Sequence, residues 1–284
     1  MSRSFSTHKN SLNRPRKEGI LPNKTLGQNF LKDRNYVKKI IDAADIKKDE
    51  TVLEIGPGMG AITLELAEKA GKVIAVEKDG KMAAMLEASL AAAGIKNVQI
   101  ITGDILELFK KDRLDIKGLK RYKVVANIPY YLTSFLIRNL LEIKNGPEDI
   151  FLMIQKEVGQ RICSQPPQMN LLSVSVGYYA TPRILFKVSK NSFYPKPKID
   201  SVFIRIAPKG IEKNNGFFDI VKAGFSHPRK QLLNNLSDGL SINREGVKKW
   251  LESNNIKPEQ RAETISLEQW EKLLASFPYR EKKE

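Results

Sequence analysis

The sequence predicts an α/β protein: a Rossmann-like sheet of mostly parallel strands, followed by a small all-helical region. Short apolar runs recur at regular intervals in the first half of the chain, and segments with helical periodicity separate them. That alternation is typical of a parallel sheet covered by helices on both faces. After Pro208 and Gly210 the strand-like runs stop and every further segment has helical periodicity.

The elements follow in chain order. Asp33 is a helix cap, and an apolar stripe behind it predicts a helix over 33–44. Five strands are then expected at 51–55, 72–76, 98–102, 122–126 and 149–154, and helices at 61–70, 80–93, 155–164 and 170–180. Two antiparallel strands at 184–188 and 202–206 precede helices at 217–225, 228–240, 243–253 and 266–276.

Three parts are expected along the chain. Residues 1–24 hold six Lys or Arg against one acid, Glu18, with no apolar period, and so form a flexible basic arm. The same segment is also similar to an organelle transit peptide. Residues 25–208 form the α/β domain, and residues 209–284 form the helical one, in which Trp250 and Trp270 fall on apolar stripes and are assigned to core packing.

Charge and composition limit the classes of function that the chain can have. The 284 residues carry a net charge of +16, which favours a polyanionic partner, although a merely solvated surface gives the same count. The single cysteine, Cys163, excludes an internal disulfide and a cysteine-based zinc site, and fits a reducing, cytoplasmic setting. His8 and His227 show no metal-ligand spacing, so no metal is expected, and no apolar run is long enough to cross a membrane.

A glycine-rich loop follows the first of the parallel strands. Glycines at positions 56 and 58 allow a sharp turn and a close approach of ligand to backbone. The loop fits a dinucleotide site as well as an S-adenosylmethionine site, because Gly56, Gly58 and Ala61 match the dinucleotide pattern. Glu77, at the end of the second strand, suits either ligand because a carboxylate there can accept both ribose hydroxyls.

Three further residues favour S-adenosylmethionine. Glu54 places an acid before the glycines, which fits a ligand with an amino group and a cationic sulfonium. Asp104 ends the third strand and can accept the adenine amine, and Asn127 ends the fourth. Acids or amides at the ends of four successive strands face one crevice. An NAD-dependent oxidoreductase would also have the glycine loop and Glu77, but that function does not explain the segment that begins at Asn127.

That segment is Asn127-Ile128-Pro129-Tyr130, and its chemistry suits an exocyclic amine on a base. The nitrogen is a poor nucleophile because its lone pair is delocalised into the ring. The side-chain carbonyl of Asn127 and the backbone carbonyl of Ile128 can accept its N–H bonds and aim the lone pair. Pro129 fixes the backbone, and Tyr130 offers a stacking surface.

With these motifs, the chain from about residue 24 to 277 resembles the small-subunit ribosomal RNA adenine N6,N6-dimethyltransferases. The resemblance implies an S-adenosylmethionine-dependent Rossmann-like methyltransferase that dimethylates two adjacent adenines near the 3′ end of that RNA. The opening motif Leu26–Leu31 assigns Asn29 and Leu31 to the methionine end of the cofactor. The resemblance also implies a cofactor site built from Asn29, Leu31, Glu54, Gly56, Gly58, Glu77, Lys78, Asp104, Ile105 and Asn127.

The segment Phe193–Ser201 also matches the family, and it assigns Phe193 to contact with the target base, although such a residue alone is more often a core anchor. Arg229, Lys230, Lys196 and Lys198 are assigned to RNA, with small-subunit ribosomal RNA or a 30S-type ribosomal particle as partner and a monomer as the default state. Tyr131 and Asn170 depart from the family pattern, which puts base entry and one RNA contact in question.

Two alternatives stay open. A related group with the same motifs modifies one adenine in large-subunit RNA and confers macrolide resistance. Residues 225–232 and 261–264 are similar to the small-subunit group instead. A non-catalytic ribosome-assembly or RNA-binding factor is compatible with all of the basic residues.

Overall fold

The computed structural model describes residues 27–110, 121–128, 132–143 and 145–278. The arm predicted over 1–24 and two predicted site residues, Pro129 and Tyr130, lie outside this part of the chain. The described residues form two compact units. The first runs to Gly159 and resumes over Arg183–Pro208, and the second comprises Gln160–Pro182 and the chain from Lys209 onward.

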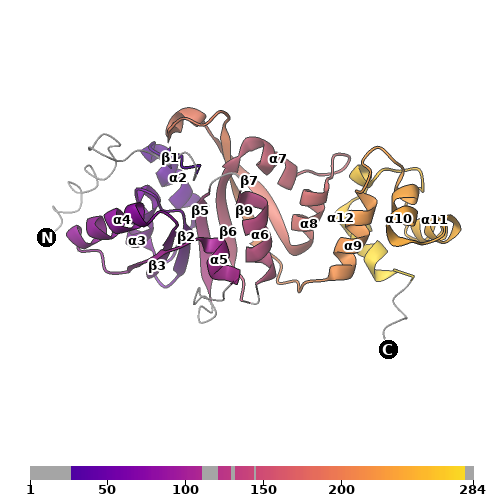
Figure 1. Cartoon of the computed structure of the whole chain (residues 1–284), viewed down its shortest axis with the longest axis horizontal. Coiled ribbons are helices and arrows are strands. Elements are labelled where there is room, and N and C mark those ends of the chain that lie inside the picture. Colours follow the sequence, from indigo (N-terminus) through magenta and orange to yellow (C-terminus); the bar gives the residue numbers. More distant parts are fainter. Residues whose placement is uncertain (1–26, 111–120, 129–131, 144, 279–284) are drawn as a thin grey trace. The chain divides into compact units, whose positions relative to one another are not determined.

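A seven-stranded mixed sheet is the centre of the first unit (Figure 1). Its strands are β2 (Thr51–Ile55), β3 (Lys72–Glu77), β4 (Val98–Thr102), β5 (Tyr122–Asn127), β6 (Asp149–Gln155), β7 (Ala180–Val188) and β9 (Ser201–Pro208). They lie in the order β4-β3-β2-β5-β6-β9-β7. The first five are parallel, and β9 is antiparallel to β6. The α/β prediction is therefore confirmed.

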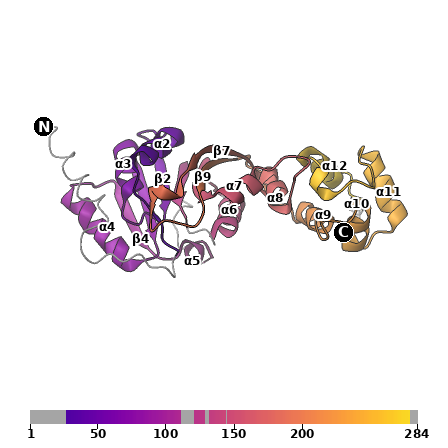
Figure 2. The same cartoon turned by 90° about the horizontal axis from the view of Figure 1, so that it is seen from above.

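Helices cover the sheet on both sides. They are α2 (Arg34–Ala44), α3 (Ala61–Lys69), α4 (Gly80–Ala92), α5 (Ile105–Lys110), α6 (Thr133–Glu142) and α7 (Lys156–Ile162). Asp33 caps α2 as predicted, accepting a hydrogen bond from the Asn35 N–H at 3.0 Å. Val37 and Ile40 of α2 enter an apolar core with Val52 and Val125 of the sheet. Figure 2 shows α2 and α3 on the opposite side of the strands from α5 and α6.

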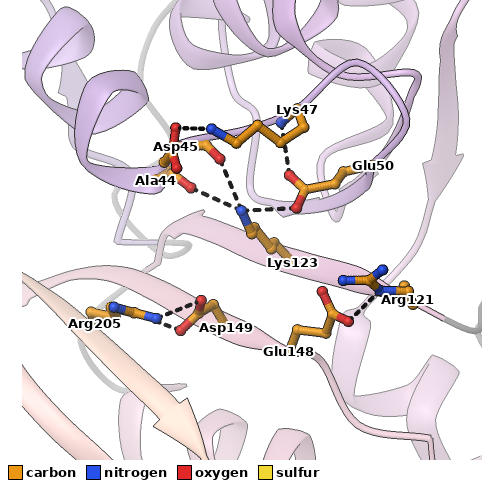
Figure 3. A network of polar contacts seen from close by, with 9 residues as sticks. All are labelled: Ala44, Asp45, Lys47, Glu50, Arg121, Lys123, Glu148, Asp149 and Arg205. Carbon is orange, nitrogen blue, oxygen red and sulfur yellow. Dashed lines mark hydrogen bonds and ion pairs between the residues drawn. The ribbon is translucent and has the colours of Figure 1, made fainter.

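Lys123 holds together the edge of the sheet at which the parallel strands begin (Figure 3). Its ammonium group donates to the backbone carbonyls of Ala44 at 3.3 Å and Asp45 at 2.9 Å, and forms an ion pair with Glu50 at 3.0 Å. The two carbonyls lie at the end of α2, where helix carbonyls lack intrahelical partners. One nearly buried cation therefore joins α2, β5 and the start of β2.

A second contact in Figure 3 joins the antiparallel pair of strands. Arg205 of β9 binds both carboxylate oxygens of Asp149 of β6, at 2.6 and 2.9 Å. The two-pronged geometry aligns the strand ends more firmly than a single bond does.

A separate ladder of two short strands joins distant parts of the first unit. β1 (Phe30–Leu31) pairs antiparallel with β8 (Phe193–Tyr194), with Phe30 opposite Tyr194 and Leu31 opposite Phe193. The backbone N–H of Lys32 extends the ladder by donating to the Ser192 carbonyl at 2.9 Å. The sequence does not predict this pairing.

The second unit is helical. Its helices are α8 (Leu171–Tyr179), α9 (Asn215–Gly224), α10 (Leu232–Leu240), α11 (Arg244–Ser253) and α12 (Leu267–Ala275), and η4 (Ala262–Thr264) is a short 3-10 turn. Tyr178 of α8 stacks on Phe217 of α9 with ring centroids 3.9 Å apart. Trp270 is fully buried and Trp250 nearly so, which confirms the core role predicted for both.

Some element limits differ from the sequence prediction. α10 begins at Leu232 and not at 228, because residues 226–230 form bends and a turn. Helices α5 and α6 were not predicted, and η3 (Lys190–Ser192) is a further short 3-10 turn. Residues 160–182 group with the C-terminal helices in the second unit, and the chain enters that unit again after Pro208.

None of the helices in the described part of the chain is long and apolar enough to span a membrane. No group of three or more His, Cys, Asp or Glu side chains among them is arranged to hold a metal ion.

Candidate cofactor and substrate site

The sheet order places the site at the carboxyl ends of β2 and β5. The chain proceeds outward from β2 through β3 to β4 and then returns to β5 on the other side of β2. Open parallel sheets bind ligands where the strand order reverses in this way. Ile55 and Ala126 are register partners, so the glycine loop after Ile55 and the amide of Asn127 emerge side by side.

Two adjoining hollows occupy this crevice. The inner hollow encloses about 780 Å³ of space, including its open mouth. It is lined by nine of the predicted site residues: Asn29, Gly56, Gly58, Glu77, Lys78, Asp104, Ile105, Asn127 and Ile128. The outer hollow is lined by two more, Leu31 and Glu54, together with Tyr194. Phe30, Gly56 and Asn127 line both hollows.

The glycine loop needs its glycines for two reasons. Gly56 and Gly58 have φ of +71° and +54°, a left-handed backbone that other residues adopt at a cost. A Cβ at Gly58 would also lie 2.9 Å from the ring of Phe30. Glu77 fastens the loop, because its carboxylate accepts the Gly58 N–H at 3.0 Å and the Asp79 N–H at 2.9 Å. The loop and the end of β3 are therefore one hydrogen-bonded unit.

Glu54 is an acid held in an apolar setting. It is 2% exposed, and burial raises its pKa to about 8, with the nearby Glu77 charge adding to the rise and the Thr63 hydroxyl opposing it. Its Oε2 atom has no hydrogen-bond partner among the described residues. Burial also raises the pKa of Glu77, against the backbone N–H groups of Asp79 and Gly58. Such a pair of acids favours a cationic ligand in the crevice.

Asp104 lines the inner hollow and is held there by two contacts. Its Oδ1 accepts the Leu106 N–H at 2.9 Å, and its Oδ2 forms an ion pair with Lys78 at 2.8 Å. Lys78 is about half exposed, so this pair lies at the surface and contributes little to stability. It does join the ends of β3 and β4 across the hollow.

Asn127 is oriented by a backbone contact. Its Nδ2 donates to the Asn29 carbonyl at 3.0 Å. A carbonyl only accepts, so the NH₂ group must be the half of the amide that faces Asn29. The side-chain carbonyl of Asn127 is thereby directed away from Asn29, and the amide cannot rotate without losing the bond.

Phe193 is placed differently from its predicted role. It is 2% exposed, belongs to the apolar core, and lines neither hollow, because strand alternation turns it inward. Its neighbour Tyr194 is 44% exposed and lines the outer hollow. Sequence reasoning missed Tyr194 and Phe30, although both lie inside segments that it singled out.

The residues assigned to RNA lie in both units. Lys196 and Lys198 are exposed in the loop between β8 and β9. Arg229 and Lys230 are exposed in the segment before α10, where Lys230 lies 3.4 Å from Asp238. Asn235, fully buried, holds that segment by donating to the Gly224 and His227 carbonyls at 2.7 and 3.0 Å.

The sheet order, the glycine loop and the acids at the strand ends define a Rossmann-like methyltransferase. Residues 21–277 match the model of the family described as ribosomal RNA adenine dimethylase. The chain belongs to this family.

The similarity extends to individual relatives. The chain is 40% identical over 262 residues to the ribosomal RNA small subunit methyltransferase A of Dehalococcoides mccartyi strain CBDB1, covering 89% of this chain and 88% of the relative. A dimethyladenosine transferase from Plasmodium falciparum is similar in structure, with a TM-score of 0.74, 26% identity, and 87% and 97% of the two chains covered. The 23S rRNA methyltransferase ErmE has a TM-score of 0.70, 25% identity, and coverage of 87% and 98%.

Proposed function

We propose that this protein transfers methyl groups from S-adenosylmethionine to N6 of two adjacent adenines near the 3′ end of small-subunit ribosomal RNA. The observation that carries the proposal is the convergence of Glu54, Glu77, Asp104 and Asn127 on adjoining hollows at the switch point of the sheet. The relatives named for small-subunit RNA support this substrate over the large-subunit alternative.

The donor set fits S-adenosylmethionine. Glu77 is placed for the ribose hydroxyls, and Asp104 for the adenine amine. Glu54 has an unsatisfied carboxylate oxygen and lines the outer hollow with Leu31, which suits the cationic methionine end. When bound, S-adenosylmethionine supplies a methyl group already activated by its sulfonium. No metal ion and no strong base are part of the proposal.

The work of the protein is then positioning. Asn127 presents its carbonyl oxygen to the N6 amine, because its NH₂ group is held by Asn29. The Ile128 carbonyl is the second acceptor in the proposal, and Pro129 and Tyr130 keep their predicted roles around the base, whereas Phe193 supports the site from the core. Fixed dipoles of this kind stabilise the charge that develops on the amine without reorganising during the reaction.

Enzymes that act on bases extrude the base from its stack, and in the proposal this protein reaches the target adenine in the same way. Arg229, Lys230, Lys196 and Lys198 are proposed to hold phosphates of the RNA. A single chain acting on a small-subunit particle is the simplest assembly.

The direct test supplies radiolabelled S-adenosylmethionine and under-methylated small or large ribosomal subunits to the purified protein. N6,N6-dimethyladenosine from digested small-subunit RNA is the expected product. Label in the large subunit would instead place the protein with the macrolide-resistance group. Absence of label from both, with the cofactor still bound, would favour the non-catalytic assembly role.

Asn127→Ala tests the mechanism within the same assay. The variant is expected to lose about 100-fold or more in turnover, as when one preorganised hydrogen-bonding group is removed from an active site. Its affinity for S-adenosylmethionine, measured by calorimetry, should fall far less than its turnover, because Asn127 is only one of the cofactor contacts and the acids that hold the cofactor are intact. Undiminished turnover would show that the amide is not used.

A further inference from the structure

We propose that Asn235 is a positioning residue that holds Arg229 and Lys230 in place for the phosphates of the RNA, a role that rests on the proposed function and deepens it. Asn235 lies near the start of α10, and its side chain is fully buried. Arg229 and Lys230 belong to the basic loop (residues 225–231), which joins α9 to α10. Residues 226–231 are all exposed, so the loop buries little surface of its own to keep it ordered.

The amide of Asn235 is hydrogen-bonded on both sides beneath this loop. Its Nδ2 atom donates to the Gly224 carbonyl at 2.7 Å and to the His227 carbonyl at 3.0 Å. Its Oδ1 atom accepts the Ser226 hydroxyl at 3.4 Å. Because the two carbonyls only accept, the NH₂ half of the amide must face them. One buried side chain therefore connects the last residue of α9, two residues of the basic loop, and α10.

The His227 carbonyl links this contact to the basic side chains. It also accepts the backbone N–H of Lys230 at 3.0 Å, which closes the turn that contains Arg229. A carbonyl oxygen has two lone pairs, so it can accept both donors. Hydrogen bonds in such a chain polarise and strengthen one another. Loss of the Asn235 donor therefore weakens the turn itself as well as the end of α9.

Both ends of the basic loop have other anchors, so Asn235 acts on its middle. At the start, the Phe225 ring packs against Trp270, with ring centroids 5.7 Å apart. At the end, the Leu232 N–H donates to the Gln260 carbonyl at 2.7 Å. A substitution at Asn235 should leave these anchors in place, while the turn between them gains freedom.

Order in this turn matters because long basic side chains lose freedom when they bind. The Lys230 side chain is about half exposed and lies 3.4 Å from Asp238, a surface pair of little strength. Arg229 has no ion-pair partner in the described part of the chain. Both cations can therefore bind phosphates. A backbone that is already ordered lowers the entropy lost on binding, and that loss grows again when the backbone is released.

The test measures binding to under-methylated small ribosomal subunits over a range of salt concentrations. Each phosphate contact contributes about 0.7 to 0.9 to the slope of log affinity against log salt. Asn235→Ala should therefore lower the slope by about 1 to 2, as the Arg229→Ala/Lys230→Ala double variant does. Added to that double variant, Asn235→Ala should change the slope and the affinity no further, because the side chains that it positions are gone. A wild-type slope in Asn235→Ala, or full additivity with the double variant, would overturn the proposal.

Leu236→Ala is the matched control. Leu236 is the next residue of α10 and is equally buried, but its side chain cannot hydrogen-bond the loop. The variant should lower the unfolding midpoint and keep the wild-type salt slope. Affinity for S-adenosylmethionine should be unchanged in both variants, because the cofactor site belongs to the first unit. A slope lowered equally in Leu236→Ala would show that Asn235 serves only the stability of the helices.

Limited trypsin digestion measures the order of the loop and needs neither RNA nor catalysis. Trypsin cleaves after Arg and Lys in mobile segments, so it can cut after Arg229 and Lys230. These bonds should be cut on the order of 10-fold faster in Asn235→Ala than in wild type or Leu236→Ala. Equal rates in all three proteins would refute the positioning role.

A second variant and a second outcome complete the design. Asn235→Ser, whose hydroxyl retains one donor, is measured in the same way if Asn235→Ala does not fold, and should show smaller changes in the same direction. If wild type labels no RNA, the proposed reaction falls. The salt slope and the digestion then still decide whether Asn235 positions the basic loop.

Discussion

Glu54→Gln tests whether one buried acid makes both the free energy of unfolding and the binding of the cofactor depend on pH. Burial raises the pKa of Glu54 from 4.5 to about 8. Between these values the unfolded chain releases the proton while the folded chain keeps it, so the free energy of unfolding falls as the pH rises. The full difference corresponds to about 5 kcal/mol above pH 8, an upper value for one fully buried carboxyl.

The assay is denaturant unfolding of the cofactor-free protein from pH 5 to pH 9. Relative to wild type, Glu54→Gln should gain stability progressively over this range, by up to several kcal/mol at the alkaline end. Glu87→Gln is the control, because Glu87 is exposed on α4 and should leave the curve unchanged. Parallel curves for wild type and Glu54→Gln would refute the reasoning.

The same residue has a second readout in binding. At pH 7 a carboxyl with a pKa of about 8 is ~90% protonated, so a cationic ligand that needs the carboxylate should displace ~0.9 proton. Calorimetry in buffers of different ionisation enthalpy measures that release. Glu54→Gln should bind S-adenosylmethionine more weakly and release about one proton fewer than wild type. Equal proton release by both proteins would exclude Glu54 as the partner of the cation.

Three other changes test contacts that lie away from the two hollows. Lys123→Met should cost about 3 kcal/mol in denaturant unfolding, because it leaves a carboxylate and two helix-end carbonyls without their buried donor. Gly224→Ala should cost about 1–3 kcal/mol, because the new methyl would lie 2.4 Å from the Trp270 ring, and an unchanged unfolding midpoint would contradict that packing. Replacing Arg229 and Lys230 by Ala should weaken RNA binding and make it less dependent on salt; a salt slope equal to that of wild type would remove them from the RNA contact.

The sequence predicted the structure best where the local pattern of residues determines the element and its position in the sheet. The parallel strands were predictable because each is a short apolar run between helical segments. Glu77, Asp104 and Asn127 were predictable as neighbours because the carboxyl ends of parallel strands share one edge. These positions line the inner hollow in the structure.

Long-range pairing was not predictable in the same way. β1 and β8 have two residues each, too few for any periodicity, and only their partnership determines that Phe193 turns inward and Tyr194 outward. The ion pair of Lys78 with Asp104 likewise depends on the register of β3 and β4. Helix α6 has an apolar spacing at Leu136 and Leu140, but no side chain caps its first turn, so its start carries no sequence signal.

The β1–β8 ladder has a consequence for the order in which the protein matures. Its two strands lie near the beginning and near the end of the residues that form the first unit. Closing so long a loop is slower than forming local contacts. A nascent chain can build the parallel strands before Tyr194 has been synthesised, but Phe30 then has no partner strand. We expect the outer hollow, which Tyr194 lines, to be completed only after the chain returns, and therefore later than the inner hollow, to which β8 contributes no lining residue.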